Sequence, residues 1–470
     1  MRHLTPLLVA AAAVLSVAPA YADLGDQLAK LLPDDGTAED LFGHSVAISG
    51  AIAIVGTPYD DDNGIDSGSA YLFEISDPAN PTQLLKLLPD DGATHHDFGV
   101  SVAISGATAI VGADRDDDNG NASGSAYLFD TASGQQIAKL LPNDGAMNDR
   151  FGISVAISGS TAIVGALLND DNGTNSGSAY LFDISDPKNP VQIAKLLPND
   201  GAANDQFGTS VAISGAIAIV GAYFDDDNGE SSGSAYLFDS TTGRQLSKLL
   251  PDDGAEGDQF GASVAISGAT AIVGVPFDDD NGSGTGSAYL FDTTTGRQIA
   301  KLLPDDGAAF DNFGNFGISV GISGATAIVG AYHTDDNGIW SGSAYLFDTA
   351  AGQQIAKLLP NDGAEFDTFG ISVAISGATA IVGAPWNNDN GDLSGSAYLF
   401  DPAGAPSPGD LNCDGEINAF DIEPFLLALF EPDEYPNQYP DCDINLADIN
   451  GDGSINAFDI EPFLELLFGP

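Results

Sequence analysis

Two segments near the C-terminus carry oxygen-bearing side chains at the spacing that a calcium ion requires. Each is a twelve-residue stretch with oxygens at positions 1, 3, 5, 9 and 12 and glycine at position 6. Calcium takes oxygen ligands in this pattern, the residue at position 7 binding through its carbonyl, and the glycine permits the sharp turn. A solvated turn is the alternative, but it explains one such match more readily than two. The predicted ligands are Asp410, Asn412, Asp414, Glu416, Asn418 and Asp421 in the first loop and Asp448, Asn450, Asp452, Ser454, Asn456 and Asp459 in the second.

A second set of carboxylates occurs in seven loops that each end in Asp-Asn-Gly. The aspartates of this tripeptide are Asp62, Asp118, Asp171, Asp227, Asp280, Asp336 and Asp389. One interpretation is a tight turn, because Asn-Gly readily adopts positive φ and Asp caps turn amides. The other is a site for a hard cation such as calcium, because closely spaced carboxylates repel one another unless a cation neutralises them. The sequence leaves both open.

The chain shows no pattern typical of a catalytic site. His-Glu-x-x-His and the phosphate-binding loop are absent from the sequence. An acid/base pair needs two carboxylates in different environments, whereas nearly every carboxylate before the C-terminal segments recurs at a fixed spacing. We therefore expect no catalytic residues and no enzyme activity.

Charge composition restricts the partners. The chain has 13 Lys and Arg residues against 68 Asp and Glu residues, a net charge of −55. A surface of this kind repels nucleic acids and anionic membranes, so neither is expected as a partner. A cation is the complementary partner, and calcium suits carboxylate oxygens.

The first 22 residues have the pattern of a secretory signal peptide. A basic start precedes an apolar run, and residues 20–22 (Ala-Tyr-Ala) fit a cleavage site, so the mature chain is expected to begin at Asp23. No later apolar stretch approaches the length of about 18 residues that spans a membrane. We predict a protein that is secreted or held at the cell surface. In that setting the two cysteines, Cys413 and Cys442, predict one disulfide bond.

Internal repeats indicate the fold. The tetrapeptide Ala-Tyr-Leu-Phe occurs seven times, and each repeat holds four short apolar runs separated by Gly, Asp, Asn or Pro. Four strands in a repeat of this length predict one blade of a β-propeller. The first run, residues 27–33, precedes the first complete repeat, and no equivalent follows Phe400. We predict an all-β, seven-bladed β-propeller over residues 23–401, closed by the N-terminal run as the outermost strand of the last blade.

Each repeat also contains a Phe-Gly pair, and the last repeat adds Gly-Ala-Pro at 383–385. The pairs begin at Phe42, Phe98, Phe151, Phe207, Phe260, Phe316 and Phe369. Over about residues 27–401 this pattern resembles the FG-GAP repeats of integrin-type propellers. In that family calcium often sits in an acidic loop between the Phe-Gly strand and the Gly-Ala-Pro strand. Here that connection is a Ser-Gly-Ala turn without a carboxylate, so the resemblance supplies no calcium ligands for the propeller.

Strand order predicts where the acidic loops lie. In an up-and-down blade, the loop between the second and third strands shares a face with the crossover to the next blade, and both are acidic here. The same face carries side chains that differ between repeats, namely Tyr59, Arg115, Leu168, Phe224, Phe277, His333, Trp340 and Trp386. Variation on a constant scaffold predicts a binding surface for a protein or a glycan. The alternative is that these aromatic side chains pack between neighbouring loops.

Residues 402–408 (Pro-Ala-Gly-Ala-Pro-Ser-Pro) predict a linker before a separate domain at 409–470. In this domain each calcium loop leads into an apolar helix, expected at 422–430 and 460–468. Paired loop-helix units without a leading helix resemble a dockerin, a small α-helical module with EF-hand-like calcium loops that binds cohesin domains. The resemblance implies calcium as cofactor and a cohesin-like or other extracellular protein as partner. The module differs from the family in having no Lys or Arg.

These patterns together predict a secreted, calcium-binding interaction or scaffold protein. The propeller would present the ligand face, and the dockerin-like module would attach it to a partner. The alternative is a carbohydrate-active enzyme, a hydrolase or lyase, or an accessory subunit of a polysaccharide-degrading assembly, because dockerin-like modules are often joined to such enzymes.

Overall fold

The computed structural model describes residues 24–279, 284–306 and 320–402 and, further on, residues 409, 411–412, 417, 419–432, 434–439, 442, 444–449 and 454–468. The predicted signal peptide and residues 403–408 of the predicted linker lie outside the described residues. The chain divides into two compact units, one spanning Leu24–Pro402 and the other containing the C-terminal helices. Within the described ranges, no helix has the length and apolar character needed to cross a membrane.

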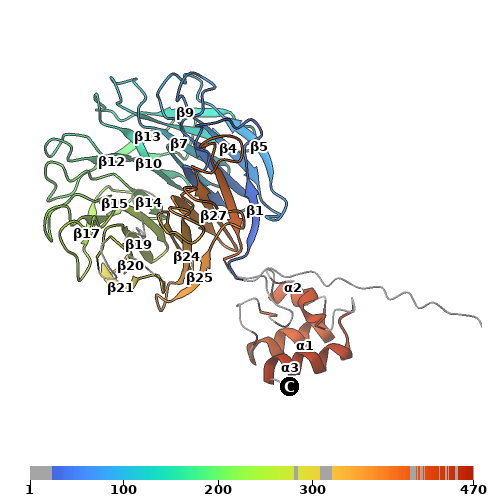
Figure 1. Cartoon of the computed structure of the whole chain (residues 1–470). Helices are drawn as coiled ribbons and strands as arrows, with labels where there is room; N and C mark the ends of the chain where they lie inside the picture. Colours follow the sequence, from blue (N-terminus) through green and yellow to red (C-terminus); the bar gives the residue numbers. More distant parts are fainter. Residues whose placement is uncertain are drawn as a thin grey trace, which may run out of the picture. The chain divides into compact units, whose positions relative to one another are not determined.

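The first unit consists of seven four-stranded antiparallel sheets arranged as the blades of a ring (Figure 1). Blade 1 contains β2 (Ser45–Ser49), β3 (Ile52–Thr57), β4 (Ser69–Glu74) and β5 (Thr82–Leu87). Blade 2 contains β6 (Ser101–Ser105), β7 (Thr108–Ala113), β8 (Ser125–Asp130) and β9 (Gln136–Leu140). Blade 3 contains β10 (Phe151–Ser158), β11 (Thr161–Ala166), β12 (Ser178–Asp183) and β13 (Val191–Leu196). Blade 4 contains β14 (Val211–Ser214), β15 (Ile217–Ala222), β16 (Ser234–Asp239) and β17 (Gln245–Leu249). Blade 5 contains β18 (Ser263–Ser267), β19 (Thr270–Val275), β20 (Ser287–Asp292) and β21 (Arg297–Leu302). Blade 6 contains β22 (Val320–Ser323), β23 (Thr326–Ala331), β24 (Ser343–Asp348) and β25 (Gln354–Leu358). Blade 7 contains β26 (Ser372–Ser376), β27 (Thr379–Ala384), β28 (Ser396–Phe400) and β1 (Gln27–Leu31). The predicted seven-bladed propeller is confirmed.

The ring is closed by strands from opposite ends of the propeller. β1 pairs antiparallel with β28, with Leu31 opposite Ala397, and in Figure 1 it lies beside the last blade. The backbone N–H of Phe42 donates to the carbonyl of Ser394 at 3.0 Å, which joins blade 1 to blade 7. The predicted role of the N-terminal strand is therefore confirmed, and it covers the edge that β28 would otherwise expose.

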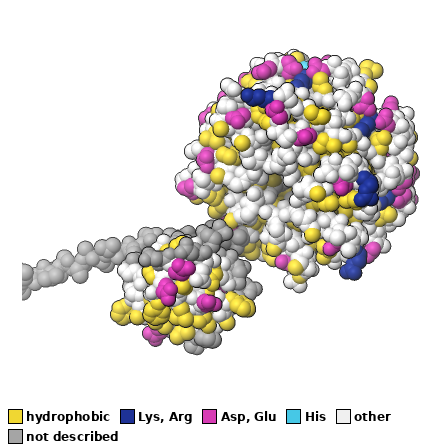
Figure 2. Space-filling model, turned by 180° about the vertical axis from the view of Figure 1, so that it is seen from behind, with side chains coloured by type: hydrophobic (Ala, Val, Ile, Leu, Met, Phe, Trp, Pro, Cys, Tyr) yellow, Lys and Arg dark blue, Asp and Glu magenta, His cyan; other side chains and the backbone are white. Residues whose placement is uncertain are grey.

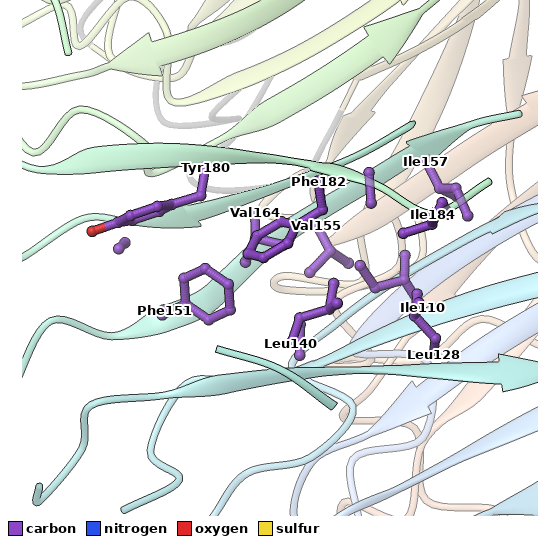
Figure 3. Close-up of a cluster of buried hydrophobic side chains, with 13 residues drawn as sticks. Ile110, Leu128, Leu140, Phe151, Val155, Ile157, Val164, Tyr180, Phe182 and Ile184 are labelled. Carbon is purple, nitrogen blue, oxygen red and sulfur yellow. The ribbon is translucent and has the colours of Figure 1, made fainter. Parts of the chain in front are cut away.

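Buried aromatic side chains between neighbouring blades explain the Phe-Gly pairs. Phe151 is fully buried, meets Tyr180 edge to face at 5.5 Å, and lies in one cluster with Ile110 and Leu128 of the preceding blade (Figure 3). The glycine of the pair permits a close approach of backbones. At Gly99, where φ is +96°, a Cβ atom would lie 2.3 Å from the carbonyl oxygen of Ser69, so a larger residue would separate the blades.

The C-terminal unit contains short helices packed on a small apolar core. The helices are α1 (Ile422–Phe430), α2 (Tyr435–Gln438) and α3 (Ile460–Phe468), with 3₁₀ turns at Ala419–Asp421, Ile444–Ala447 and Ala457–Asp459. Phe425 and Phe463 stack at the centre, with ring centroids 4.2 Å apart. The bounds of α1 and α3 agree with the two predicted helices.

Candidate functional site

Each acidic loop begins two residues before the aspartate of its Asp-Asn-Gly tripeptide. This first residue anchors the loop. In blade 1 this residue is Asp60, which is 4% exposed. Its Oδ1 accepts a hydrogen bond from the backbone N–H of Asp62 at 3.0 Å, and its Oδ2 accepts from the hydroxyls of Ser69 and Tyr71 at 3.1 Å. These contacts are those of an aspartate capping a turn, so the turn interpretation holds for this residue.

A lysine ammonium group lies among the carboxylates of the same loop. Lys86 Nζ is 2.8 Å from Asp60, 2.6 Å from Asp62 and 2.9 Å from Asp35, and it lies 5.1 Å from the centre of the Tyr71 ring. Burial alone lowers the pKa of Lys86, but the hydrogen bonds to the carboxylates outweigh burial and raise that pKa above its ordinary value. For Asp35 the directions are reversed. Burial alone raises its pKa, but the hydrogen bonds from Lys86 and Tyr71 outweigh burial and bring the pKa of Asp35 below its ordinary value. Because Asp35 lies in the crossover and Asp62 in the β3–β4 loop, the two acidic loops share one face, as predicted.

The arrangement recurs around the ring. Five more aspartates of the Asp-Asn-Gly tripeptides form an ion pair with the lysine of their blade: Asp118 with Lys139, Asp171 with Lys195, Asp227 with Lys248, Asp336 with Lys357 and Asp389 with Lys30. Asp280 lies outside the described residues. Among the residues that the structure describes, no group of three Asp, Glu, His or Cys side chains is arranged to hold a metal ion. The repulsion that motivated a calcium site is thus offset by lysine, and calcium at these loops stays a prediction.

Sequence reasoning missed these lysines, although a signal was present. One lysine occupies the same position of the Lys-Leu-Leu-Pro motif in every repeat, and Lys188 is the only other lysine in the chain. Strand register explains the position, because Lys86 on β5 lies opposite Tyr71 on β4. Partners on paired strands point to the same side of a sheet, so the lysine reaches the loop that its tyrosine contacts.

The described part of the C-terminal loops contains two buried carboxylates. Asp421 and Asp459, at position 12 of each loop, are fully buried. Asp421 Oδ1 accepts hydrogen bonds from the backbone N–H groups of Leu411 and Asn412 at 2.7 and 3.1 Å, and Asp459 Oδ2 accepts from that of Asn456 at 2.8 Å. Asp448 and Ser454 are also described, whereas Asp410, Asp414, Glu416, Asn418, Asn450, Asp452 and Cys413 lie outside the described residues. The predicted disulfide between Cys413 and Cys442 stays a prediction.

The face of the propeller that carries the acidic loops and the crossovers between blades is called the loop face below. Its varied side chains both pack on neighbours and remain accessible. Trp340 stacks on His333 at 4.8 Å and meets Phe366 edge to face at 5.8 Å. It is nevertheless 42% exposed, and Tyr59, Phe277 and Trp386 are 38%, 38% and 39% exposed. Both interpretations of these residues therefore apply in part.

Large side chains on this face occupy left-handed backbone positions. Trp340 and Leu393 both have a φ of 55°, and Phe366 has a φ of 71°. The equivalents of Trp340 in other blades include Asp66 and Asn175, residue types that adopt this conformation at lower cost. Strained backbone of this kind persists where packing or function offsets its cost.

A cavity of about 530 Å³ opens on the loop face between blades 7 and 1. Its apolar walls include Tyr59, Trp386 and Leu393, and its polar groups include Glu39 and His44. Burial lowers the pKa of His44 to about 4, so its imidazole is neutral near pH 7. Aromatic walls with a few hydrogen-bonding groups are typical of a small-molecule binding site.

Asp and Glu side chains are spread over the propeller surface, with apolar side chains between them (Figure 2). A comparison with curated proteins found no match. The FG-GAP repeat family matches the propeller seven times, at residues 26–73, 81–129, 135–182, 190–238, 244–291, 297–347 and 353–400. The first of these ranges runs from β1 of the closing blade to β4 of blade 1, so the family's unit is offset from the structural blade. The seven matches together cover most of the sequence, and the chain belongs to the FG-GAP repeat family.

Proposed function

We propose that the propeller is a scaffold that binds a glycan on its loop face. The observation that carries this proposal is the aromatic cavity between blades 7 and 1, which opens on a face whose backbone is repeated but whose side chains are not. Sugar rings have apolar faces that pack on aromatic side chains such as Tyr59 and Trp386. The neutral imidazole of His44 can donate and accept hydrogen bonds with sugar hydroxyls.

Glycan-array binding of the full chain tests this proposal. Trp386→Ala is expected to weaken binding of a neutral oligosaccharide about 30-fold, because truncating a central aromatic anchor costs about 2 kcal/mol or more. Phe277→Ala is the matched control, since Phe277 occupies the equivalent loop position of blade 5 and does not line the cavity. Equal loss in both variants, or no glycan binding at all, would contradict the proposal.

We propose further that the C-terminal unit is a dockerin-like calcium module that attaches the protein to a partner. Two fully buried carboxylates, Asp421 and Asp459, support calcium, since each stands at position 12 of a predicted loop, where calcium takes a carboxylate ligand. Phe420 and Phe458 support docking, because these equivalent side chains of the two copies are each 77% exposed, and apolar side chains gather on this unit in Figure 2.

Calorimetry with calcium distinguishes the two units. The full chain is expected to bind calcium, and Asp421→Asn and Asp459→Asn are each expected to remove one site. A chain ending at Pro402 is the control and should lack the heat of these two sites. Equal heats from both chains would refute a C-terminal calcium module.

Export of the protein, inferred from residues 1–22, is also part of the proposal. Residues of this pattern are removed during secretion. Mass spectrometry of the secreted protein should place its N-terminus at Asp23. Retention of the first 22 residues in a cell-associated product would contradict export.

Glycan cleavage is the second candidate function, and one observation favours it. Asp97 and Asp114 form a pair of buried carboxyl groups in blade 2 that the other blades do not repeat. Burial and the charge of Asp114 raise the pKa of Asp97 to about 6, and burial raises the pKa of Asp114. We favour binding, because the two residues are only 5% and 3% exposed and each carboxylate faces an arginine rather than a cavity. Release of reducing sugar from a bound glycan would reverse this choice.

A further inference from the structure

A second cavity, of about 620 Å³, opens on the loop face between blades 2 and 3. Its lining differs from that of the aromatic cavity in being polar and cationic. Arg115 and Asn121 come from the β7–β8 loop, Asn148 and Arg150 from the crossover to blade 3, and Asn175 from the β11–β12 loop.

The two arginines are held from behind by buried carboxylates. Arg115 Nη1 lies 3.1 Å from Asp97 Oδ2, and Arg150 Nη1 donates to Asp114 Oδ2 at 2.6 Å. The remaining guanidinium N–H groups form a rigid planar donor set. An arginine fixed in this way loses little conformational entropy when it binds a ligand.

The other blades act as an internal control for this arrangement. The equivalents of Arg115 are Tyr59, Leu168, Phe224, Phe277, His333 and Trp386. The equivalents of Asp114 are Pro58, Leu167, Tyr223, Pro276, Tyr332 and Pro385. A buried carboxylate in place of these residues is costly, and Oδ1 of Asp97 and of Asp114 has no hydrogen-bond partner among the described residues. The cost is consistent with a role in positioning the arginines.

These arginines are also the accessible strong cations of the loop face. Among the described residues, each lysine of this face is enclosed by carboxylates, with a side chain 14–19% exposed. The side chains of Arg115 and Arg150 are 43% and 27% exposed. Lys188, Arg244 and Arg297 lie in or beside the connections of the opposite face. The cavity therefore presents two partly exposed guanidinium groups, each paired from behind with one aspartate, on a chain whose net charge is −55.

We infer that this cavity binds a carboxylate-bearing sugar, a uronate residue of an acidic glycan. Arg115 and Arg150 would receive the carboxylate, because guanidinium groups pair with carboxylates in a planar, two-bonded geometry. The amides of Asn121, Asn148 and Asn175 would meet the sugar hydroxyls.

One carboxylate, that of Asp117, also lines the cavity, and local donors already occupy one of its oxygens. Its Oδ1 accepts hydrogen bonds from the backbone N–H of Ala122 at 2.7 Å and from the Asn121 amide at 3.4 Å. The inference rests on the proposal that the loop face binds glycans, and it adds the chemical class of the ligand at a separate cavity.

Titration of the full chain with a trigalacturonate in calcium-free buffer tests the inference. Without calcium, bridging between uronates and surface carboxylates contributes nothing. Arg115→Gln should weaken trigalacturonate binding roughly 10- to 150-fold, since a hydrogen bond to a charged group contributes about 1.5–3 kcal/mol. Arg115→Lys, which keeps the charge but not the planar donor pair, should retain part of the affinity. Arg297→Gln, on the opposite face, is the control and should bind like the natural chain.

The outcomes separate this inference from the proposed glycan site. Loss of trigalacturonate binding in Arg115→Gln, with neutral oligosaccharide binding unchanged, supports the inference. A second outcome overturns the inference alone. In it, neutral oligosaccharide binding depends on Trp386, but the natural chain binds trigalacturonate no better than Arg115→Gln does. Trigalacturonate binding without neutral oligosaccharide binding overturns the aromatic site alone, and binding of neither overturns both. A triglutamate peptide that binds equally well would overturn the assignment to a sugar.

Discussion

Replacing Lys248 by Met tests whether a lysine holds the acidic loops of a blade together. Lys248 Nζ lies 2.9 Å from Asp200, 3.1 Å from Asp225 and 2.5 Å from Asp227. The side chain of Asp225 is 5% exposed, whereas those of Asp200 and Asp227 are 48% and 43% exposed. The pair with Asp225 is therefore the buried one, and removal of the lysine leaves that carboxylate without its cation.

Blade 3 supplies a matched control for this substitution. There Asn169 occupies the place of Asp225, and within the described residues Lys195 forms ion pairs with the half-exposed Asp144 and Asp171 alone. Breaking a buried ion pair costs about 3–5 kcal/mol, whereas two exposed pairs are worth about 1–2 kcal/mol together. Each variant loses two half-exposed pairs, so these cancel, and Lys248→Met should destabilise the propeller by about 3–5 kcal/mol more than Lys195→Met, the cost of the buried pair. Both variants lose the same contact of an ammonium group with a tyrosine ring, so this term cancels.

Thermal unfolding followed by calorimetry, with and without EDTA, measures the difference. Lys248→Met should melt below Lys195→Met, and the double variant Lys248→Met/Asp225→Asn should recover much of the loss. Equal melting of the two single variants would refute the reasoning. EDTA that lowers the melting of a chain ending at Pro402 would show that a bound metal ion, rather than lysine, stabilises the loops.

Three further predictions follow from the fold. A chain lacking β1 should melt well below the full chain by calorimetry, because β28 loses its paired strand; equal melting would contradict ring closure. Leu393→Asn should raise stability by about 1 kcal/mol in denaturant unfolding, because Asn tolerates the left-handed backbone that Asn175 adopts at the equivalent position, and a loss of stability would contradict this. Burial and the charge of Asp225 raise the pKa of Asp205 to about 6, above the unfolded value of about 3.9. The contribution of Asp205 to the free energy of unfolding is therefore fully present below about pH 4 and is lost as pH rises through about 6. Asp205→Asn should reduce the fall in stability over this pH range, as measured by denaturant unfolding. An unchanged pH profile would contradict the assignment.

The repeats made the propeller predictable from the sequence. Apolar runs at a fixed spacing predicted the strands. The run before the first Phe-Gly predicted the closing strand, because β26, β27 and β28 need a fourth strand and β1 supplies it. The C-terminal helices were predictable for a similar reason, since both copies carry the same Phe-Asp-Ile-Glu-Pro segment across the helix start.

The charge partners were not predictable in the same way. Lys86 meets Asp35 and Asp60, which are 51 and 26 residues away in the sequence, only because strand pairing and the blade-to-blade crossover bring them together. Sequence reasoning therefore counted carboxylates on one face without their lysines. Arg115 was predicted to lie on this face, whereas Arg150 was missed, because Arg150 meets Asp114 only across a blade boundary.

The central claim is that the loop face between blades 7 and 1 binds a glycan, and hydrogen exchange tests it most directly. The measurement compares the full chain with and without a saturating neutral oligosaccharide. Slower exchange is expected in the crossover and loop that carry His44 and Tyr59 and in the β27–β28 loop that carries Trp386, with no change in the β2–β3 and β4–β5 turns of the opposite face. Protection confined to those opposite turns, or to the C-terminal unit, would contradict the account.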